Sequence, residues 1–415
     1  MATPTASARS APLAGVRVLD LSRVLAGPWS GQLLGDLGAD VVKVERPRIG
    51  DDTRAWGPPY LLDEQGHSTG EAAYFLCANR NKRSVTIDLA SADGQALVLR
   101  LAQQADVVLE NFKLGGLAQY GLDADRLREL NPRLVVCSIT GFGQTGPYAQ
   151  RGGYDFLIQG MGGLMSLTGR AEGTEGAGPQ KVGVALTDIM TGLYATIAVQ
   201  AALAERERSG LGQHIDLALL DVQIAVLANQ ASSYLTSGAV PGRMGNAHPS
   251  VVPYQDFPTT DGDMILAIGN DAQFARFCAV AGHGEWASDE RFSTNPQRVV
   301  NRTTLVPLIR QATILRTTLE WTAALGAAAV PCGPINRLDE VFADEHVRAR
   351  GVRIELPHPT AGLVPLVANP IRLSGSPIEY TRAPPLLGEH TDEVLADWLG
   401  MGKAERADLR ERGVL

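Results

Sequence analysis

Residues 16–46 read VRVLDLSRVLAGPWSGQLLGDLGADVVKVER and indicate the fold class of the whole chain. The runs 16–21 and 41–45 are each short and apolar enough for a buried strand. Between them, the leucines of 33–37 recur at helical spacing after Ala26-Gly27-Pro28. A strand, a helix and a second strand in this order predict a βαβ unit with a parallel strand pair.

The same alternation continues along the chain. Further strands are expected over 85–89, 106–110 and 134–139, and an amphipathic helix over 94–105. This pattern predicts an α/β fold with a Rossmann-like, doubly wound sheet. Because ligands bind such sheets at the carboxyl ends of the strands, residues at those ends are the first candidates for a site.

Three parts of the chain differ in character. Residues 12–237 are expected to form the large domain. Residues 238–330 contain a hairpin-like segment over 254–269, followed by short helices, and predict a smaller α+β domain. Residues 331–415 are rich in proline and are expected to return to the large domain as a C-terminal segment.

The stretch 141–183 is glycine-rich, and compact domains rarely carry so long a segment without a functional reason. Two helices are expected after it, over 189–208 and 217–235. The strongly apolar stretch 193–204 is shorter than the roughly 20 residues of a membrane span, so no membrane partner is predicted.

Composition and charge exclude several classes of protein. The 415 residues are 45% hydrophobic and 20% charged, which is typical of a globular chain and excludes an extended disordered one. The 37 basic against 45 acidic residues leave a net charge of −8, which argues against a nucleic acid or an anionic membrane as partner. The four cysteines lie far apart, as expected for a reduced, cytoplasmic protein, and the seven histidines show no metal-binding spacing, so no metal site is predicted.

The segment Gly141-Phe142-Gly143-Gln144-Thr145-Gly146 matches the dinucleotide-binding pattern and follows a predicted strand. That pattern requires a helix to begin inside the motif, but Pro147 and Gly152-Gly153 follow without apolar periodicity. Glu45 ends a strand, where a dinucleotide enzyme holds the ribose, yet the preceding turn lacks the glycine pattern. A glycine-rich turn is therefore favoured over a nicotinamide or flavin site.

Two charged residues have both a structural and a functional interpretation. Asp188 opens a long helix, where an acid is favoured by the helix dipole. The alternative is that its carboxylate, ionised at neutral pH, is a nucleophile toward an acyl group. Arg46 follows a strand end and is either a solvated side chain or a phosphate clamp.

Together these segments resemble the class III CoA-transferases, the family of formyl-CoA transferase that also contains α-methylacyl-CoA racemase. The resemblance spans Leu13 to the C-terminus, and its glutarate-type branch is the most similar. The segments that carry it are Val24-Leu25-Ala26-Gly27-Pro28, residues 37–47, Gly50-Asp51-Asp52-Thr53-Arg54 with Ala55-Trp56-Gly57-Pro58-Pro59, residues 79–84, residues 106–112, Tyr154-Asp155, Thr187-Asp188 and Gly245-Asn246-Ala247-His248-Pro249.

The resemblance implies roles for particular residues. Asp188 matches the nucleophile, and Tyr154 matches the residue that faces the acyl group. The residues implied to bind CoA are Leu25, Arg46, Ile87, Asp88, Asn111, Phe112 and Lys113. Gln119 replaces an arginine that contacts CoA phosphate in some members, and Gly245 to Ser250 replaces the glycine-rich lid of formyl-CoA transferase.

A second carboxylate on the substrate would need a fixed cation to offset its desolvation, and Arg54 is the candidate. The alternative is that Arg54 pairs with Asp51 or Asp52 as a structural clamp of its loop.

The implied reaction moves CoA from an acyl-CoA, succinyl-CoA in the glutarate-type branch, to a small carboxylic acid through an aspartyl anhydride and an aspartyl-CoA thioester. CoA is substrate and product, and no metal or redox cofactor is expected. The family also implies an interlocked homodimer. A racemase is the first alternative, although Tyr154 stands where racemases have a histidine and is a poor base at pH 7. A non-enzymatic CoA-binding protein is the second.

Overall fold

The computed structural model describes residues 10–415. Contacts divide the chain into two compact units. Unit 1 comprises the described residues up to Leu164 together with Val182–Ser232 and Arg348–Leu415, and unit 2 comprises Met165–Lys181 and Ser233–Val347.

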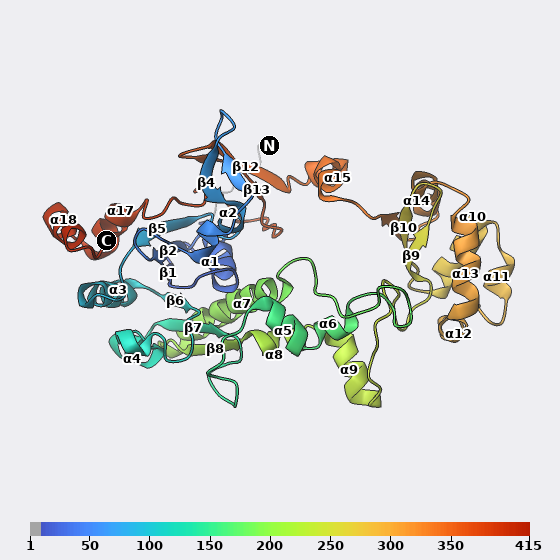
Figure 1. Cartoon of the computed structure of the whole chain (residues 1–415), viewed down its shortest axis with the longest axis horizontal. Helices are drawn as coiled ribbons and strands as arrows, with labels where there is room; N and C mark the ends of the chain where they lie inside the picture. The colour runs from blue at the N-terminus through green and yellow to red at the C-terminus, as the bar shows by residue number, and fades with distance from the viewer. Residues whose placement is uncertain (1–9) are drawn as a thin grey trace, which may run out of the picture. The chain divides into compact units, whose positions relative to one another are not determined.

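Unit 1 is built on a parallel sheet of six strands in the order β5-β2-β1-β6-β7-β8. Figure 1 shows these strands with the helices of unit 1 around them. The elements of unit 1 are β1 (Arg17–Asp20), α1 (Ala26–Asp36), β2 (Asp40–Glu45), η1 (Asp52–Ala55), β3 (Tyr60–Leu62), β4 (Ser68–Ala72), α2 (Ala73–Leu76), β5 (Lys82–Thr86), α3 (Ala92–Gln104), β6 (Val107–Glu110), η2 (Ala118–Tyr120), α4 (Ala124–Leu130), β7 (Val135–Thr140), α5 (Asp155–Met161), α7 (Leu186–Ser209), β8 (His214–Ala218), α8 (Leu219–Ala225), β12 (Arg353–His358), β13 (Gly362–Val367), α17 (Thr391–Leu399) and α18 (Lys403–Glu411).

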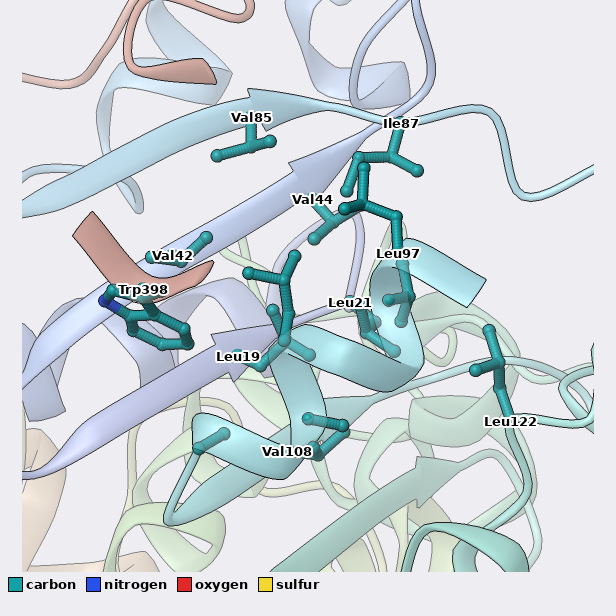
Figure 2. Close-up of a cluster of buried hydrophobic side chains, with 14 of the residues drawn as sticks. Leu19, Leu21, Val42, Val44, Val85, Ile87, Leu97, Val108, Leu122 and Trp398 are labelled. Carbon is teal, nitrogen blue, oxygen red and sulfur yellow. The ribbon is translucent and has the colours of Figure 1, made fainter. Parts of the chain in front are cut away.

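Helices cover both faces of this sheet, because alternate strand residues point to opposite sides. On one face Leu19 and Val108 pack against α3, α4, α17 and α18, in the cluster drawn in Figure 2. On the other face Val18 and Val107 pack against α1, α5, α7 and α8. The predicted α/β fold with a parallel central sheet is confirmed.

Helix α7 contains the helix expected over 189–208, which is confirmed. Among the described residues it is the one helix long and apolar enough to cross a membrane by length and composition. Core helices of globular proteins meet the same criterion, and the buried side of α7, including Ala195, Val199 and Leu203, packs into the core cluster against the sheet.

Two element predictions in unit 1 were wrong. The strand expected over 85–89 is β5, which begins at Lys82, because Lys82, Arg83 and Ser84 are buried polar residues with partners elsewhere in the fold. The helix expected over 217–235 begins instead as β8, which pairs with β7, and is then divided into α8 and α9 (Ala228–Ser237). Ala228 has a φ of +46°, which a continuous helix does not allow.

Unit 2 holds a three-stranded antiparallel sheet in the order β11-β10-β9, packed against helices around Phe257, Phe277 and Trp321. Its elements are β9 (Tyr254–Pro258), β10 (Asp263–Ala267), α10 (Asp271–Ala281), α11 (Glu285–Ser288), α12 (Asn295–Val300), α13 (Arg302–Thr313), α14 (Thr318–Ala327), β11 (Cys332–Pro334) and α15 (Leu338–Ala343). Helices α6 (Leu164–Leu167), α9 and α16 (Glu345–Ala349) cross the boundaries between the units.

The contact-based division differs from the predicted boundaries of 12–237, 238–330 and 331–415. Unit 2 continues to Val347, because β11 pairs with β10. It also includes Met165–Lys181, where Glu172 forms an ion pair of 3.1 Å with Arg243. The C-terminal part of the chain belongs to unit 1 from Arg348 onward.

Candidate active site

Two pockets lie in unit 1 at the carboxyl ends of the parallel strands, where a sheet of this kind binds ligands. The Arg46 pocket, of about 820 Å³, is formed at the ends of β2 and β5. The Asp188 pocket, of about 870 Å³, lies beside it, between the β1–α1 turn, the ends of β6 and β7 and the start of α7. Arg23, Asp52 and Phe112 line both pockets, so the two form one groove.

The groove brings together nine of the ten residues proposed from the sequence. Arg46, Ile87 and Asp88 line the Arg46 pocket. The residues that line the Asp188 pocket are Leu25, Asn111, Phe112, Lys113, Tyr154 and Asp188. Arg54 lines neither pocket.

Asp188 lies in the first turn of α7 and is 9% exposed. Its carboxylate accepts no hydrogen bond from any residue within 10–415, although its position would suit a helix cap. The cap comes from Asp155, whose Oδ1 accepts the backbone N–H of Thr187 at 2.8 Å and that of Asp188 at 3.3 Å. This geometry favours the functional interpretation of Asp188 over the structural one.

Two effects make the Asp188 carboxylate unusually basic. Burial, and then the negative charge of Asp155, raise the pKa of Asp188 to about 7. The two carboxylates also act on Tyr74 in α2. Burial, the charge of Asp188 and the charge of Asp155 contribute to raising the pKa of the Tyr74 hydroxyl to about 12. Asp188 therefore changes from acid to carboxylate near neutral pH.

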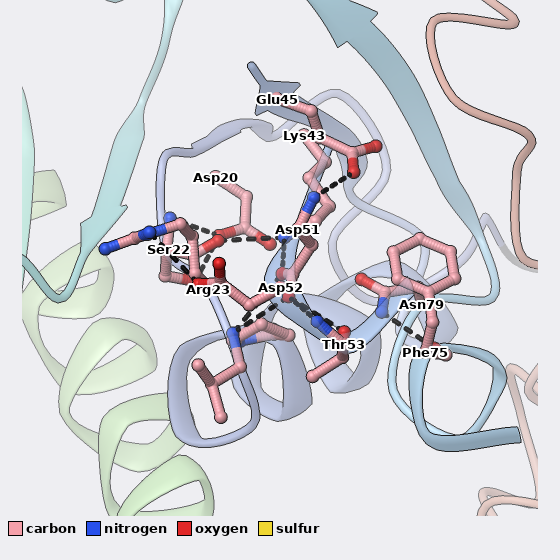
Figure 3. Close-up of polar contacts among 12 residues, drawn as sticks. Asp20, Ser22, Arg23, Lys43, Glu45, Asp51, Asp52, Thr53, Phe75 and Asn79 are labelled. Atoms are coloured by element: carbon pink, nitrogen blue, oxygen red, sulfur yellow. Dashed lines mark hydrogen bonds and ion pairs between the residues drawn. The ribbon is translucent and has the colours of Figure 1, made fainter. Parts of the chain in front are cut away.

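A network of buried ion pairs adjoins the groove, and Figure 3 shows the part of it around Asp20, Lys43 and Asp51. Lys43 pairs with Asp51 at 2.8 Å and also donates to the carbonyl oxygen of Ser22. Lys82 pairs with Asp20 at 3.0 Å, and Asp20 accepts from the backbone and hydroxyl of Ser22.

These contacts fix the charge states of the network and the shape of the β1–α1 turn. Burial opposes ionisation of Asp51, but Lys43 and the bonds from Thr53 outweigh it and lower the pKa of Asp51 to about 2. The same carboxylate accepts the backbone N–H of Val24, whose φ of +71° is unusual for a β-branched residue. The strained turn is thus held in place where Leu25 enters the Asp188 pocket.

Arg54 also forms buried ion pairs within the fold. Its guanidinium forms two bonds of 2.8 Å to Glu45, approaches Glu71 at 3.4 Å and donates to the carbonyl oxygen of Pro385. It also lies over the ring of Phe75. The geometry favours a structural clamp for Arg54, with Glu45 as the partner in place of Asp51 or Asp52.

Two further contacts build the walls of the Asp188 pocket. Asn111 accepts from the backbone N–H of Arg23 and donates to its carbonyl oxygen, which joins the end of β6 to the β1–α1 turn. Gly141 and Gly153 bring two backbone segments together, and a Cβ on Gly141 would lie 2.7 Å from the Cα of Gly153. The helix that follows this glycine segment, α5, begins at Asp155, so the context of a dinucleotide fingerprint is missing.

The sequence interpretation missed three contributors to the groove. Arg23 pairs with Asp52 at 3.0 Å where the pockets meet. Arg151 lines the Asp188 pocket with its guanidinium over the rings of Phe142 and Tyr148. Asp155 lines neither pocket but caps the start of α7, a role that the sequence did not indicate. No local pattern signals any of these contacts, because each of the three residues lies in or beside a loop.

Gln119 does not line either pocket, and its side chain donates to the carbonyl oxygen of Gly116. Its neighbour Tyr120 lines the Arg46 pocket instead. Gly245 to Ser250, which replaces the glycine-rich lid of formyl-CoA transferase, belongs to unit 2.

Comparison with known proteins identifies the class. The sequence model of CoA-transferase family III matches residues 13–391, and the chain belongs to that family. It is 53% identical to a succinate–glutarate CoA-transferase of Agrobacterium fabrum over 94% of this chain and 96% of that one. It is 40% identical to the human succinyl-CoA:glutarate CoA-transferase over 97% and 90% of the two chains.

A solved structure of similar sequence supports the same fold. The crystal structure of a CAIB/BAIF family protein from Brucella suis matches with a TM-score of 0.82 and 52% sequence identity. The match covers 94% of this chain and 100% of that chain.

Proposed function

We propose that this family III CoA-transferase moves CoA from succinyl-CoA to glutarate, with Asp188 as the nucleophile. The observation that carries the role of Asp188 is its position: a buried carboxylate without a hydrogen-bond partner in the described chain, lining a strand-end pocket. The names of the relatives from Agrobacterium fabrum and human support the choice of substrates.

The reaction begins when a carboxylate oxygen of Asp188 attacks the thioester carbonyl carbon. The C–S bond breaks, the thiolate of CoA leaves with the electron pair, and a mixed anhydride remains on Asp188. The thiolate then attacks the Asp188 carbonyl and releases succinate, which leaves an aspartyl-CoA thioester. Glutarate repeats the two steps in reverse and leaves as glutaryl-CoA, so Asp188 returns to a free carboxylate.

The two pockets suit the two ends of an acyl-CoA. Asp188 must meet the thioester, so the pantetheine arm lies in the Asp188 pocket and the nucleotide in the Arg46 pocket. Arg46 is exposed and has no ion-pair partner among residues 10–415, and it is thus available to a phosphate group.

Backbone N–H groups can stabilise the tetrahedral intermediates. Helix α1 has no side-chain cap and no acidic residue in its first turn, and Leu25 and Ala26 at its start line the Asp188 pocket. Uncapped N–H groups at a helix start are suitable donors for an oxyanion.

A dicarboxylate needs a cation for the carboxylate that does not react. Lys113 and Arg151 line the Asp188 pocket and form no ion pair within the described residues, whereas Arg54 is engaged by Glu45. These two cations are the better candidates for that carboxylate.

Three family features are proposed with the function. A Rossmann-like arrangement is supported by the sheet order, since the chain runs outward from β1 in both directions. An interlocked homodimer is supported by exposed apolar side chains on α5 and α7: Phe156, Leu157, Met161, Leu193, Tyr194 and Ile197. A cytoplasmic location is supported by the free thiols of the four cysteines.

The test is to incubate the pure protein with succinyl-CoA and a panel of mono- and dicarboxylates and to identify the CoA esters formed. The proposal predicts glutaryl-CoA as the main product. Transfer to a monocarboxylate in preference to glutarate would contradict it. Exchange of the α-proton of a 2-methylacyl-CoA without CoA transfer would favour the racemase instead.

A further inference from the structure

Asp155 joins the start of α5 to the start of α7. Its Oδ1 accepts the backbone N–H groups of Thr187 and Asp188, and its Oδ2 accepts the side-chain amide of Gln159 at 2.7 Å. The residue at the N-cap position of α7, Ala185, offers no side-chain cap. Asp155 therefore supplies the cap of the helix that carries the nucleophile.

This arrangement separates capping from catalysis. An aspartate in the first turn of a helix ordinarily uses its oxygens to satisfy backbone N–H groups, which makes the carboxylate a weaker nucleophile. Because Asp155 satisfies these groups from another element, both oxygens of Asp188 remain free to attack. Gln159 is itself fixed, since its Oε1 accepts the backbone N–H of Val182 at 2.9 Å, and it holds Asp155 in this orientation.

The charge of Asp155 acts on the same step. Two carboxylates close together in a buried site repel each other, and acylation of Asp188 removes one of the two charges. Repulsion therefore destabilises the free carboxylate of Asp188 relative to its anhydride and its thioester. The pKa of Asp188, raised to about 7 by burial and by Asp155, supports this view.

Other titratable groups also lie near Asp188. Tyr74 approaches from α2, and burial together with the charges of Asp188 and Asp155 contributes to raising its pKa to about 12, so it stays neutral over the range in which Asp188 titrates. Lys113 and Arg151 line the same pocket, but burial and Asp155 are the two causes that shift the pKa of Asp188. Arg23, at the edge of the pocket, is paired with Asp52.

We propose that Asp155 is a positioning residue that caps α7 in place of Asp188 and favours acylation of Asp188 through its negative charge. This inference rests on the proposed function, because it requires Asp188 to be the nucleophile.

The test compares Asp155→Asn with Asp155→Glu and the wild type. Asparagine keeps an acceptor for the N–H of Thr187 but removes the charge, and glutamate keeps the charge but displaces the acceptor. The measurement is the pH dependence of the first acyl transfer from succinyl-CoA, followed by rapid mixing between pH 5 and pH 9. Asp216→Asn is the matched control, because this carboxylate also accepts a backbone N–H, that of Gln144, and lines neither pocket of the groove.

We expect the acid limb of Asp155→Asn to move at least about 0.5 pH units lower, with a slower acylation on the plateau. The midpoint of Asp155→Glu should remain near that of the wild type, even where its rate falls. An unchanged midpoint in Asp155→Asn, or an equal shift in both variants, would overturn the inference. If Asp155→Asn does not fold, a midpoint in Asp155→Glu that moves below that of the wild type also overturns it. Activity in Asp188→Ala would instead overturn the proposed function, so the two failures are distinguishable.

Discussion

Arg54 and Glu45 form a two-pronged ion pair, with Nε and Nη2 of the arginine each 2.8 Å from a carboxylate oxygen of the glutamate. Both side chains are nearly buried; Glu45 lines the Arg46 pocket, whereas Arg54 lines neither pocket of the groove. A cation that looked available to a substrate in the sequence is therefore used within the fold.

Arg54→Ala should destabilise the protein rather than alter its choice of acceptor. The substitution leaves the Glu45 carboxylate buried without its main partner, which costs about 3–5 kcal/mol. We expect a lower denaturation midpoint and an equal fractional loss of turnover with glutarate and with pentanoate. A selective loss of glutarate turnover would restore Arg54 as the residue that binds the remote carboxylate.

Arg46→Ala should raise the KM for the acyl-CoA and leave the KM for the acceptor nearly unchanged. A charged hydrogen bond to phosphate contributes about 1.5–3 kcal/mol, which corresponds to roughly a 10- to 100-fold increase in KM. Steady-state kinetics with each substrate varied in turn measures this. Arg48→Ala is the control, since Arg48 is exposed nearby and does not line the pocket; an equal effect in both variants would refute a specific role for Arg46.

Arg151→Met and Lys113→Met test which cation binds the remote carboxylate. The variant that removes this cation should lose about tenfold or more in preference for glutarate over pentanoate, because the second carboxylate is then desolvated without a partner. The ratio of kcat/KM for the two acceptors is the quantity to measure. If neither variant changes the ratio and both raise the KM for succinyl-CoA, these cations bind CoA instead.

Asp188→Asn should stabilise the protein in a pH-dependent manner. The pKa of about 7 in the folded state lies above the ordinary value of 3.8, so ionisation of Asp188 destabilises the folded state fully above pH 7. Removing the charge should raise the free energy of unfolding by about 2–4 kcal/mol at pH 8.

This gain should shrink as the pH falls from 7 and become small near pH 4, where the carboxyl is protonated in the folded state and close to its ordinary pKa in the unfolded state. Denaturant unfolding of the wild type and the variant at pH 8, 6 and 4 gives the comparison. A difference that is the same at all three values would show that the charge of Asp188 is not the cause.

Elements with a clear local pattern of apolar residues were predicted correctly from the sequence. Elements whose residues are buried by partners far away in the sequence were not. The apolar runs around Val18 and Val42 indicate buried strands directly. The start of a long helix near Asp188 can also be recognised from the sequence alone. The beginning of β5 was missed because Lys82 and Arg83 are polar, and only Asp20 and Asp40 explain their burial.

The same limit applies to the candidate site. Arg46 directly follows a strand, and Asp188 lies at the start of a helix, so the position of each residue suggests a role in binding or catalysis. The engagement of Arg54 by Glu45 depends on a turn that no periodicity describes. The cap that Asp155 provides joins the start of α5 to the start of α7, and no sequence pattern in the segment between them predicts this contact.

The proposed mechanism requires Asp188 to become covalently attached to CoA during transfer. The direct measurement is mass spectrometry of the peptide that contains Asp188, after the protein is mixed with succinyl-CoA and quenched within one turnover. We expect a peptide heavier by the mass of CoA less one water in the wild type and no such peptide in Asp188→Ala, which should retain less than about 1% of wild-type turnover. An unmodified Asp188 peptide in the turning-over enzyme, or substantial turnover by Asp188→Ala, would contradict it.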